Sequence, residues 1–149
     1  MNTVPQVSAR GANVSAPLMK PYAALENASE LGGRFLLALL FLLSGVGKLG
    51  AYSTTAAYMS AVGVPGWLLP AVIAIEVLGG LAIVLGWKTR VVAALLAGFS
   101  LLAAVIFHNN LADQIQMIMF FKNIAIAGGF MLLVANGAGP LSVDHRLAK

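Results

Sequence analysis

The sequence contains no cysteine and little charge. Its 149 residues include 9 basic and 5 acidic side chains, and 60% of all residues are hydrophobic. Without cysteine the chain forms no disulfide, holds no metal through thiolates and carries out no dithiol exchange of its own. Only 9% of the residues are charged, against about 25% in an average soluble domain. So short a chain cannot bury this much apolar surface in one aqueous core, so the composition predicts an integral membrane protein.

The sequence also lacks the usual patterns for binding nucleic acid or nucleotides. The net charge of +4 is small and the basic residues are scattered, so no nucleic-acid partner is expected. The segment SGVGKLG, residues 44–50, is similar to a phosphate-binding loop. However, Leu42 and Leu49 stand where such a loop needs a glycine and a hydroxyl side chain. A long apolar run precedes the segment, where the loop would follow a short strand, so a nucleotide site is not expected.

Four long apolar runs make up most of the chain. Each comes close to the ~20 residues that an α-helix needs to cross the hydrocarbon core of a membrane. Because backbone groups in lipid must be paired within the segment, the runs are predicted to be helices. The predicted fold is all-α, an integral membrane four-helix bundle. The runs cover about residues 33–50, 67–86, 90–108 and 118–136.

The segments outside these runs give the expected domain limits. Residues 1–32 mix Pro, Gly, Ser, Asn and charged residues, and are predicted to form a flexible N-terminal tail with a short interfacial helix in ALENASEL. Residues 33–144 form the membrane domain, and residues 145–149 form a C-terminal tail. The segment 51–66 between the first two runs has the composition of a short surface helix.

The basic residues are divided unevenly between the two sides of the membrane. With four spans, the N-terminal tail, the short turn at 87–89 and the C-terminal tail lie on one side. That side carries seven of the nine basic residues, whereas Lys48 and Lys122 lie on the other. Cytoplasmic segments of membrane proteins carry the excess of Lys and Arg, so both termini are predicted to be cytoplasmic.

Glu76 is the most informative residue, because it lies near the middle of the second run. A carboxylate at that depth costs on the order of 2.5–3.5 kcal/mol, so it is expected to be protonated, paired or facing a polar cavity. Gly79 and Gly80 share its helical face and allow a neighbouring helix to approach closely. The predicted helix-packing residues are Gly45, Gly79, Gly80, Gly128 and Gly129.

Polar side chains gather in the outer half of the predicted bundle. Lys48 ends the first run and Lys122 lies about one turn into the fourth, so their long side chains can reach the depth of Glu76. We expect Glu76 to face Lys48, Lys122 or both. The simpler alternatives are that both lysines extend to the outer interface and that Glu76 is a structural anchor. The predicted ligand-binding residues are Lys48, Glu76, His108, Lys122 and Asn123.

No complete catalytic or metal-binding set is visible, and the catalytic residues are unknown. Haem held by two histidines needs a pair within the helices, but His145 lies in the tail and leaves only His108. A dinuclear site needs several Glu and His residues on facing helices, and no serine, histidine and acid share one depth. No metal and no cofactor held by this chain alone are therefore expected.

Several segments of the sequence form a recognisable set. They are RFLLALLFLLSGVGKLG, YMSAVGVPGW, IEVLGGLAIVLGWKTRVVAALLAGF, His108 and FFKNIAIAGGFMLLVANGAGPLSVD. Together they resemble the DoxX family of small bacterial and archaeal membrane proteins. The resemblance covers about residues 33–144 and implies a four-helix protein of the bacterial inner membrane. The family was named for an association with a terminal quinol oxidase, and relatives are linked to thiosulfate–quinone oxidoreductase and redox-stress complexes. The resemblance thus implies redox-enzyme partner subunits and a quinone as ligand.

Three functions remain open from the sequence. The first is a membrane subunit or anchor for redox enzymes, with a quinone-type pocket between the helices. The second is a structural membrane scaffold, in which the polar residues hold the helices together. The third is a proton- or cation-linked transporter of small solutes that uses Glu76. Because four helices are few for a pore, transport would favour a homo-oligomer.

Overall fold

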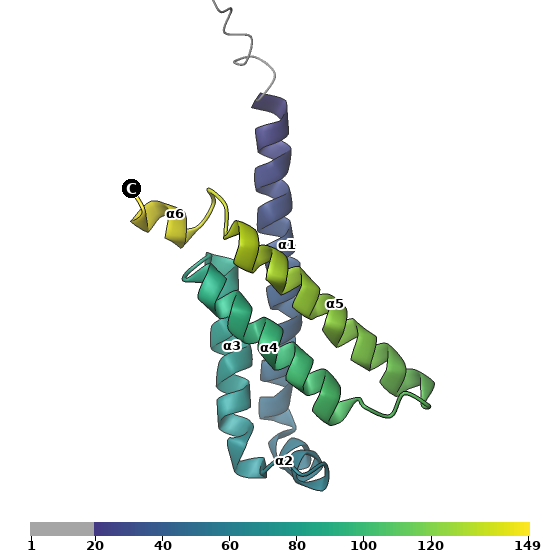
Figure 1. Cartoon of the computed structure of the whole chain (residues 1–149). Coiled ribbons are helices and arrows are strands. Elements are labelled where there is room, and N and C mark those ends of the chain that lie inside the picture. Colours follow the sequence, from purple (N-terminus) through teal and green to yellow (C-terminus); the bar gives the residue numbers. More distant parts are fainter. Residues whose placement is uncertain (1–19) are drawn as a thin grey trace, which may run out of the picture.

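The computed structural model describes residues 20–149, and the chain is helical with no strand in this range (Figure 1). Four helices of these residues are long and apolar enough to cross a membrane, which confirms the predicted all-α membrane fold. The elements are α1 (Lys20–Gly50), α2 (Tyr52–Ala61), the 3₁₀ turn η1 (Gly66–Leu68), α3 (Leu69–Leu85), α4 (Thr89–Phe107), α5 (Gln114–Asn136) and α6 (Val143–Leu147).

The first helix begins earlier than expected. α1 runs for 31 residues from Lys20, so the segment predicted as a separate interfacial helix is the beginning of α1, and the expected boundary at 32/33 lies inside a helix. The predicted flexible tail is corrected accordingly for residues 20–32, and the remaining residues 1–19 lie outside the described part. No proline interrupts the stretch from 22 to 50, and Gly32 and Gly33 each lower helix stability by only about 1 kcal/mol.

α1 packs along α3 and α4 packs along α5, and the two pairs cross (Figure 1). The first turns of α1, the α3–α4 turn and α6 lie at one end of the molecule, called the terminus end below. The end of α1, α2 and the α4–α5 loop lie at the other, called the α2 end. The short surface helix expected in 51–66 is confirmed as α2.

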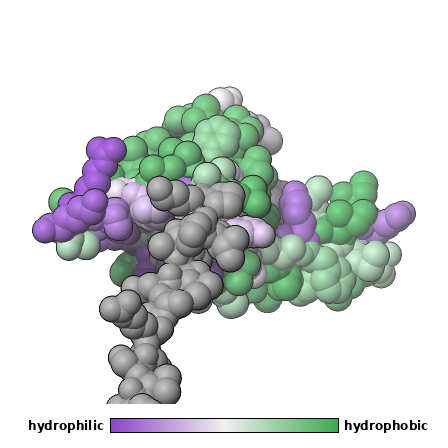
Figure 2. Space-filling view, turned by 90° about the horizontal axis from the view of Figure 1, so that it is seen from above, coloured by the Kyte–Doolittle hydropathy of each residue, from purple (hydrophilic) through white to green (hydrophobic). Residues whose placement is uncertain are grey.

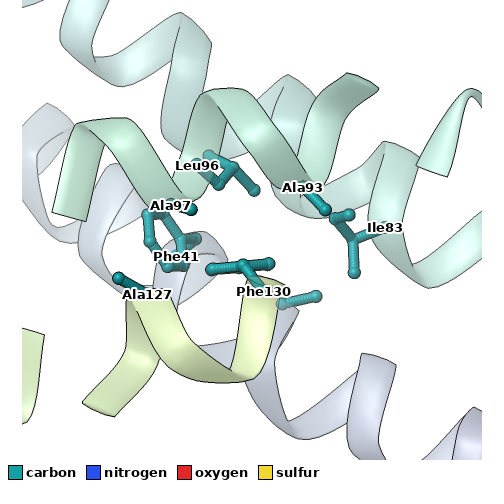
Figure 3. Close-up of a cluster of buried hydrophobic side chains, with 8 residues drawn as sticks. Phe41, Ile83, Ala93, Leu96, Ala97, Ala127 and Phe130 are labelled. Carbon is teal, nitrogen blue, oxygen red and sulfur yellow. The ribbon is translucent and has the colours of Figure 1, made fainter. Parts of the chain in front are cut away.

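The hydrophobic core lies where the two helix pairs meet (Figure 3). Phe41 of α1 reaches Phe130 of α5 with ring centroids 5.3 Å apart in an edge-to-face arrangement. Four buried alanines among the core residues allow the helix backbones to come close. The buried members of this core are Ala38, Phe41, Ile83, Ala93, Leu96, Ala97, Ala127 and Phe130.

The outward faces of the helices are apolar. Leu36, Leu43, Leu78, Leu95 and Leu132 are each about two-thirds exposed, as expected for side chains that contact lipid. In the view from the terminus end, much of the visible surface is hydrophobic, and hydrophilic residues gather on the left, the side of α6 (Figure 2). At the terminus end the polar surface therefore gathers toward α6. The α4–α5 loop at the α2 end also exposes polar residues, among them Asn109, Asn110 and Asp113.

Two predicted packing glycines bring α1 against α3. A Cβ atom at Gly45 would lie 2.7 Å from Cγ2 of Val77, and a Cβ atom at Gly80 would lie 3.0 Å from the side chain of Leu42. Carbon atoms prefer to be about 3.5–4.0 Å apart, so a Cβ atom at Gly45 would require the helices to shift, whereas at Gly80 the Leu42 side chain would have to move aside. The close approach of α1 and α3 thus depends most on glycine at position 45.

The other three predicted packing glycines differ from one another. A Cβ atom at Gly79 would lie 3.0 Å from the side chain of Leu96, and one at Gly129 would lie 3.2 Å from that of Leu37. Gly128 has no neighbouring atom within 4 Å of that position and is exposed. Contrary to expectation, Gly128 packs against nothing in the described chain, because it lies on the outward face of α5.

The C-terminal segment is tied to the turn between α3 and α4. Gly86 ends α3 with φ +68°, and Lys88 follows with φ +45°. The Asp144 carboxylate accepts hydrogen bonds from the backbone N–H groups of Lys88 (2.7 Å) and Thr89 (2.8 Å). The Asp144 N–H donates to the Gly86 carbonyl (2.9 Å). A side chain 55 residues away in sequence therefore caps the start of α4.

Arg34 is fully buried at the same end. Its Nη2 group donates to the carbonyl of Leu141 (2.6 Å), and the carboxylates of Glu30 and Asp144 lie close enough to interact with its charge. Arg34 is one of the seven basic residues on the side that the sequence predicts to be cytoplasmic. The structure shows that the residues before Asp144 fold back over it and remove it from the surface.

Candidate functional site

Glu76 and Lys48 form an ion pair between α3 and α1. Lys48 Nζ lies 2.8 Å and 2.9 Å from the two carboxylate oxygens of Glu76. It also donates to Ser44 Oγ at 2.7 Å, and the Ser44 hydroxyl donates to Glu76 at 3.1 Å. The three N–H groups of the ammonium thus have three acceptors. Of the two lysines expected to face Glu76, Lys48 is its partner.

The local sequence explains this geometry. Ser44 and Lys48 are one helical turn apart and therefore share a face of α1. Gly45, between them, lets the backbone of α3 come close, because a Cβ atom there would lie 3.1 Å from the Cβ of Glu76. The Glu76 side chain is 5% exposed and that of Lys48 is 24% exposed. The pair is therefore largely shielded from solvent.

The pair forms part of the wall of a cavity of about 430 Å³ between the two helix pairs. This volume lies in the range of about 300–1,000 Å³ that is usual for small-molecule sites. All five predicted site residues line the cavity, so the structure brings them together, and their role in binding stays a prediction. Much of the remaining wall is apolar and includes Phe41, Phe99, Leu102, Ile106, Phe107 and Ile126.

Lys122 lines the cavity from α5 but does not reach Glu76. Its Nζ atom contacts the thioether sulfur of Met119 at 2.9 Å. Within residues 20–149, the Lys48–Glu76 pair is the one ion pair present, so of the expected alternatives, Lys48, Lys122 or both, the structure shows Lys48 alone. The neighbouring Asn123 donates its amide N–H to the Met119 carbonyl (2.9 Å), which leaves its side-chain oxygen as an acceptor.

His108 lies at the cavity from the end of α4, where it is the C-terminal cap residue. Its Nδ1 atom is 2.8 Å from the side-chain oxygen of Gln116. Because an amide oxygen only accepts, Nδ1 carries a proton in this arrangement. In the neutral ring Nε2 is then a hydrogen-bond acceptor without a partner in the described chain.

α2 covers the cavity at the α2 end. The Tyr58 ring stacks on that of Phe107 with centroids 5.8 Å apart, and Met59 is buried beneath. The cavity is not fully enclosed, since Tyr58 and Lys122 are exposed. Sequence reasoning did not single out Tyr58 or Phe107, because no local pattern relates residues that are 49 positions apart.

The described residues show no metal centre. Among residues 20–149, no group of three or more His, Asp and Glu side chains could hold a metal ion. The acidic residues other than Glu76 cap helices or lie on the first turns of α1. Asp113, for example, caps α5 by accepting a hydrogen bond from the Gln116 N–H (2.9 Å). The cavity thus offers hydrogen bonds and charge to a ligand.

Comparisons with known proteins assign the chain to a family. The sequence model of the DoxX family matches residues 30–109. The chain is 47% identical over 125 residues to the inner membrane protein YqjF of Escherichia coli (strain K12), covering 84% of this chain and 96% of the relative. It is 38% identical over 120 residues to the inner membrane protein YphA of the same strain, covering 76% and 86%. No solved structure matches the chain. With its four apolar helices, the chain is therefore a multi-pass inner membrane protein that belongs to the DoxX family.

Proposed function

We propose that the cavity binds an amphipathic small molecule of the quinone type, and that the protein serves redox enzymes of the membrane as a ligand-binding subunit. The supporting observation is the composition of the cavity wall. Lys48, Glu76 and Lys122 lie beside a largely apolar lining. A quinone has the matching form, with polar oxygens on an apolar ring and tail.

The residues of the cavity wall have different roles in the proposed function. Asn123 and Lys122 offer an acceptor and a donor beside the ligand's oxygens. The unpartnered Nε2 of His108 accepts and releases a proton at the edge of the cavity. The chain has no cysteine for thiol redox chemistry of its own, and in this proposal the electrons for quinone chemistry come from a partner enzyme. The function of this chain is then to hold the ligand in place and exchange its protons.

A cavity-filling variant tests the proposal. Ala103 lines the cavity on α4, whereas Val105 on the same helix is exposed. We expect Ala103→Phe to abolish binding of a short-chain ubiquinone and of a short-chain menaquinone, and Val105→Phe to retain both. Binding is measured by calorimetry with protein in nanodiscs, and thermal unfolding confirms that both variants are folded. Equal binding by the two variants, or no binding by the unmodified protein, contradicts the proposal.

A scaffold role is the second candidate, because all three donors of Lys48 are already satisfied within the chain. In that case the polar residues hold α1 against α3 and need no ligand. Glu76→Gln distinguishes the two functions, since it keeps the shape of the side chain and removes its charge. The scaffold predicts a less stable protein with unchanged partner complexes. The ligand-binding function predicts that Glu76→Gln binds quinone more weakly than the unmodified protein, at a temperature where both proteins are fully folded.

A further inference from the structure

The two lysines of the cavity have different surroundings. Lys48 is saturated, because its ammonium donates to both oxygens of Glu76 and to Ser44. Lys122 contacts only the sulfur of Met119, and a thioether is a weak acceptor. The charge of Lys48 is therefore balanced by a carboxylate of the chain, and the charge of Lys122 is not.

No acidic residue is available to balance Lys122. The chain has 5 acidic residues, all of which lie in the described range 20–149. Glu76 is paired with Lys48, and Asp113 caps α5. The other three belong to the terminus end, where Asp144 caps α4 and Glu26 and Glu30 lie on the first turns of α1. Lys122 is thus a cation that no carboxylate of its own chain reaches.

The cavity consequently carries an excess positive charge. The charges of Lys48 and Glu76 cancel, and the charge of Lys122 remains. A charged side chain in an apolar membrane segment is costly unless an opposite charge or water stabilises it. A neutral carbonyl oxygen would leave this charge unbalanced, whereas an anionic oxygen would balance it.

We propose that the ligand of this cavity is an amphipathic anion, with one negatively charged oxygen group on an apolar body, and that Lys122 is the residue that selects it. The inference rests on the proposed ligand-binding function and narrows its ligand. Asn123, the next residue, donates its amide N–H to the Met119 carbonyl and leaves its side-chain oxygen as an acceptor, so among these neighbours the charge for an anion comes from Lys122. The chemistry is met by the ionised ring oxygen of a hydroxyquinone or by the carboxylate of a fatty acid.

Two matched ligand pairs test charge selection. One pair is an alkyl 2-hydroxy-1,4-naphthoquinone, ionised at neutral pH, and its neutral 2-methoxy ether. The other is dodecanoate and dodecanol. Binding is measured by calorimetry with the full chain in nanodiscs of neutral phosphatidylcholine. We expect the anion of at least one pair to bind roughly 10- to 100-fold more tightly than its neutral partner, the size of a hydrogen bond to a charged group. Selection in the quinone pair alone identifies a ring oxygen, and selection in both identifies any oxyanion head.

Variants at Lys122 complete the test. Lys122→Met keeps the length of the side chain and should remove the preference for the anion, while the neutral ether still binds. Lys122→Arg should restore the preference. Lys88→Met removes one positive charge at the terminus end, where Lys88 lies over the Trp87 ring, and should leave the preference unchanged. Thermal unfolding checks that each variant is folded.

Different experimental results would contradict this inference and the proposed function. If both members of each pair bind the unmodified protein equally, the cavity binds ligands but does not select anions. If Lys122→Met keeps the full preference, Lys122 extends to the membrane interface and another residue selects the ligand. Either result overturns the inference and leaves the proposed function standing. If no quinone and no ligand of either pair binds, both fail.

Discussion

The Lys48–Glu76 ion pair is largely shielded from solvent, so removal of one member leaves the other without its opposite charge. Glu76→Ala leaves the Lys48 ammonium facing a cavity without its carboxylate, and Lys48→Ala leaves Glu76 buried without its cation. Each change should lower the free energy of unfolding by about 1.5–3 kcal/mol, the value of hydrogen bonds to charged groups. The double variant should lose clearly less than the sum of the two single losses. Unfolding in detergent measures all four proteins.

Lys122 provides the control for this cycle. It lines the same cavity but makes no contact with Glu76. Glu76→Ala and Lys122→Ala should therefore combine nearly additively, within about 0.5 kcal/mol. Additivity between Glu76 and Lys48, or strong coupling between Glu76 and Lys122, would contradict the pairing described above.

Asp144 gives a prediction that depends on pH. Burial raises the pKa of its carboxyl, but the hydrogen bonds from Thr89 and from the Lys88 N–H, together with the charge of Arg34, outweigh this and hold the pKa below its ordinary value. Because the folded pKa lies below the unfolded one, Asp144 stabilises the fold above about pH 3.9. This contribution is lost as the pH falls through the folded pKa. Asp144→Ala should cost about 1 kcal/mol at neutral pH, as for the loss of a helix cap.

The measurement is the unfolding midpoint of both proteins between neutral and acidic pH. The difference between the unmodified protein and Asp144→Ala should shrink as the pH falls. Glu26→Gln, at an exposed position on α1, serves as the control and should leave the pH profile unchanged. A constant difference across this range would show that the carboxylate charge is not what caps α4.

Single residues also show which contacts can be predicted from the sequence and which cannot. The depth of Glu76 and its lysine partner could be predicted, because an intramembrane carboxylate must be compensated and few cations are within reach. The burial of Arg34 and the capping of α4 by Asp144 could not. Both depend on the C-terminal segment folding back onto the α3–α4 turn, and no local pattern encodes that contact.

At the scale of the helices, glycine decides how closely α1 approaches α3. Gly45→Ala would place a Cβ atom 2.7 Å from Val77 Cγ2 and 3.1 Å from the Glu76 Cβ. Neither atom is the flexible end of a side chain, so the helices must shift, at a cost of about 1–3 kcal/mol. We expect Gly45→Ala to lower the unfolding temperature and to disturb the Lys48–Glu76 pair.

Gly128→Ala is the matched control on α5. It adds the same methyl group at a position with no neighbouring atom within 4 Å. Alanine is favoured over glycine in a helix by about 1 kcal/mol, so this variant should be as stable as the unmodified protein or more stable. A loss of stability at Gly128 comparable to that at Gly45 would indicate that the outward face of α5 packs against another molecule.

The limits of the helices could be predicted well where the sequence carries a clear stop. The expected runs 67–86 and 90–108 differ by one residue at each end from the observed spans Gly66–Leu85 and Thr89–Phe107. α5 begins at Gln114 rather than at 118, and Asp113 with Gln116 three residues later is a capping pattern that was available in the sequence. The early start of α1 was missed because composition, unlike helix capping, does not mark where a polar helix begins.

For the whole molecule, the sequence predicts four spans but not how they cross. The cavity exists because α1 with α3 and α4 with α5 form two pairs that cross, with α2 at one end (Figure 1). Predicting that five polar residues gather in the outer half of the bundle needed only helix lengths. Predicting which of them touch required the crossing itself, which depends on side-chain packing at Phe41 and Phe130.

The orientation in the membrane remains a prediction, and the absence of cysteine makes it directly testable. Single variants Asn110→Cys in the α4–α5 loop and Lys149→Cys at the C-terminus carry the only thiol of their chain. Because seven of the nine basic residues are predicted from the sequence to share one side of the membrane with the C-terminus, we expect a membrane-impermeant maleimide added to intact cells to label Cys at 110 and not at 149. Both sites should be labelled after the cells are opened. The reverse pattern would place the α2 end in the cytoplasm, and the cavity would then exchange protons with the cytoplasm and not with the outer side.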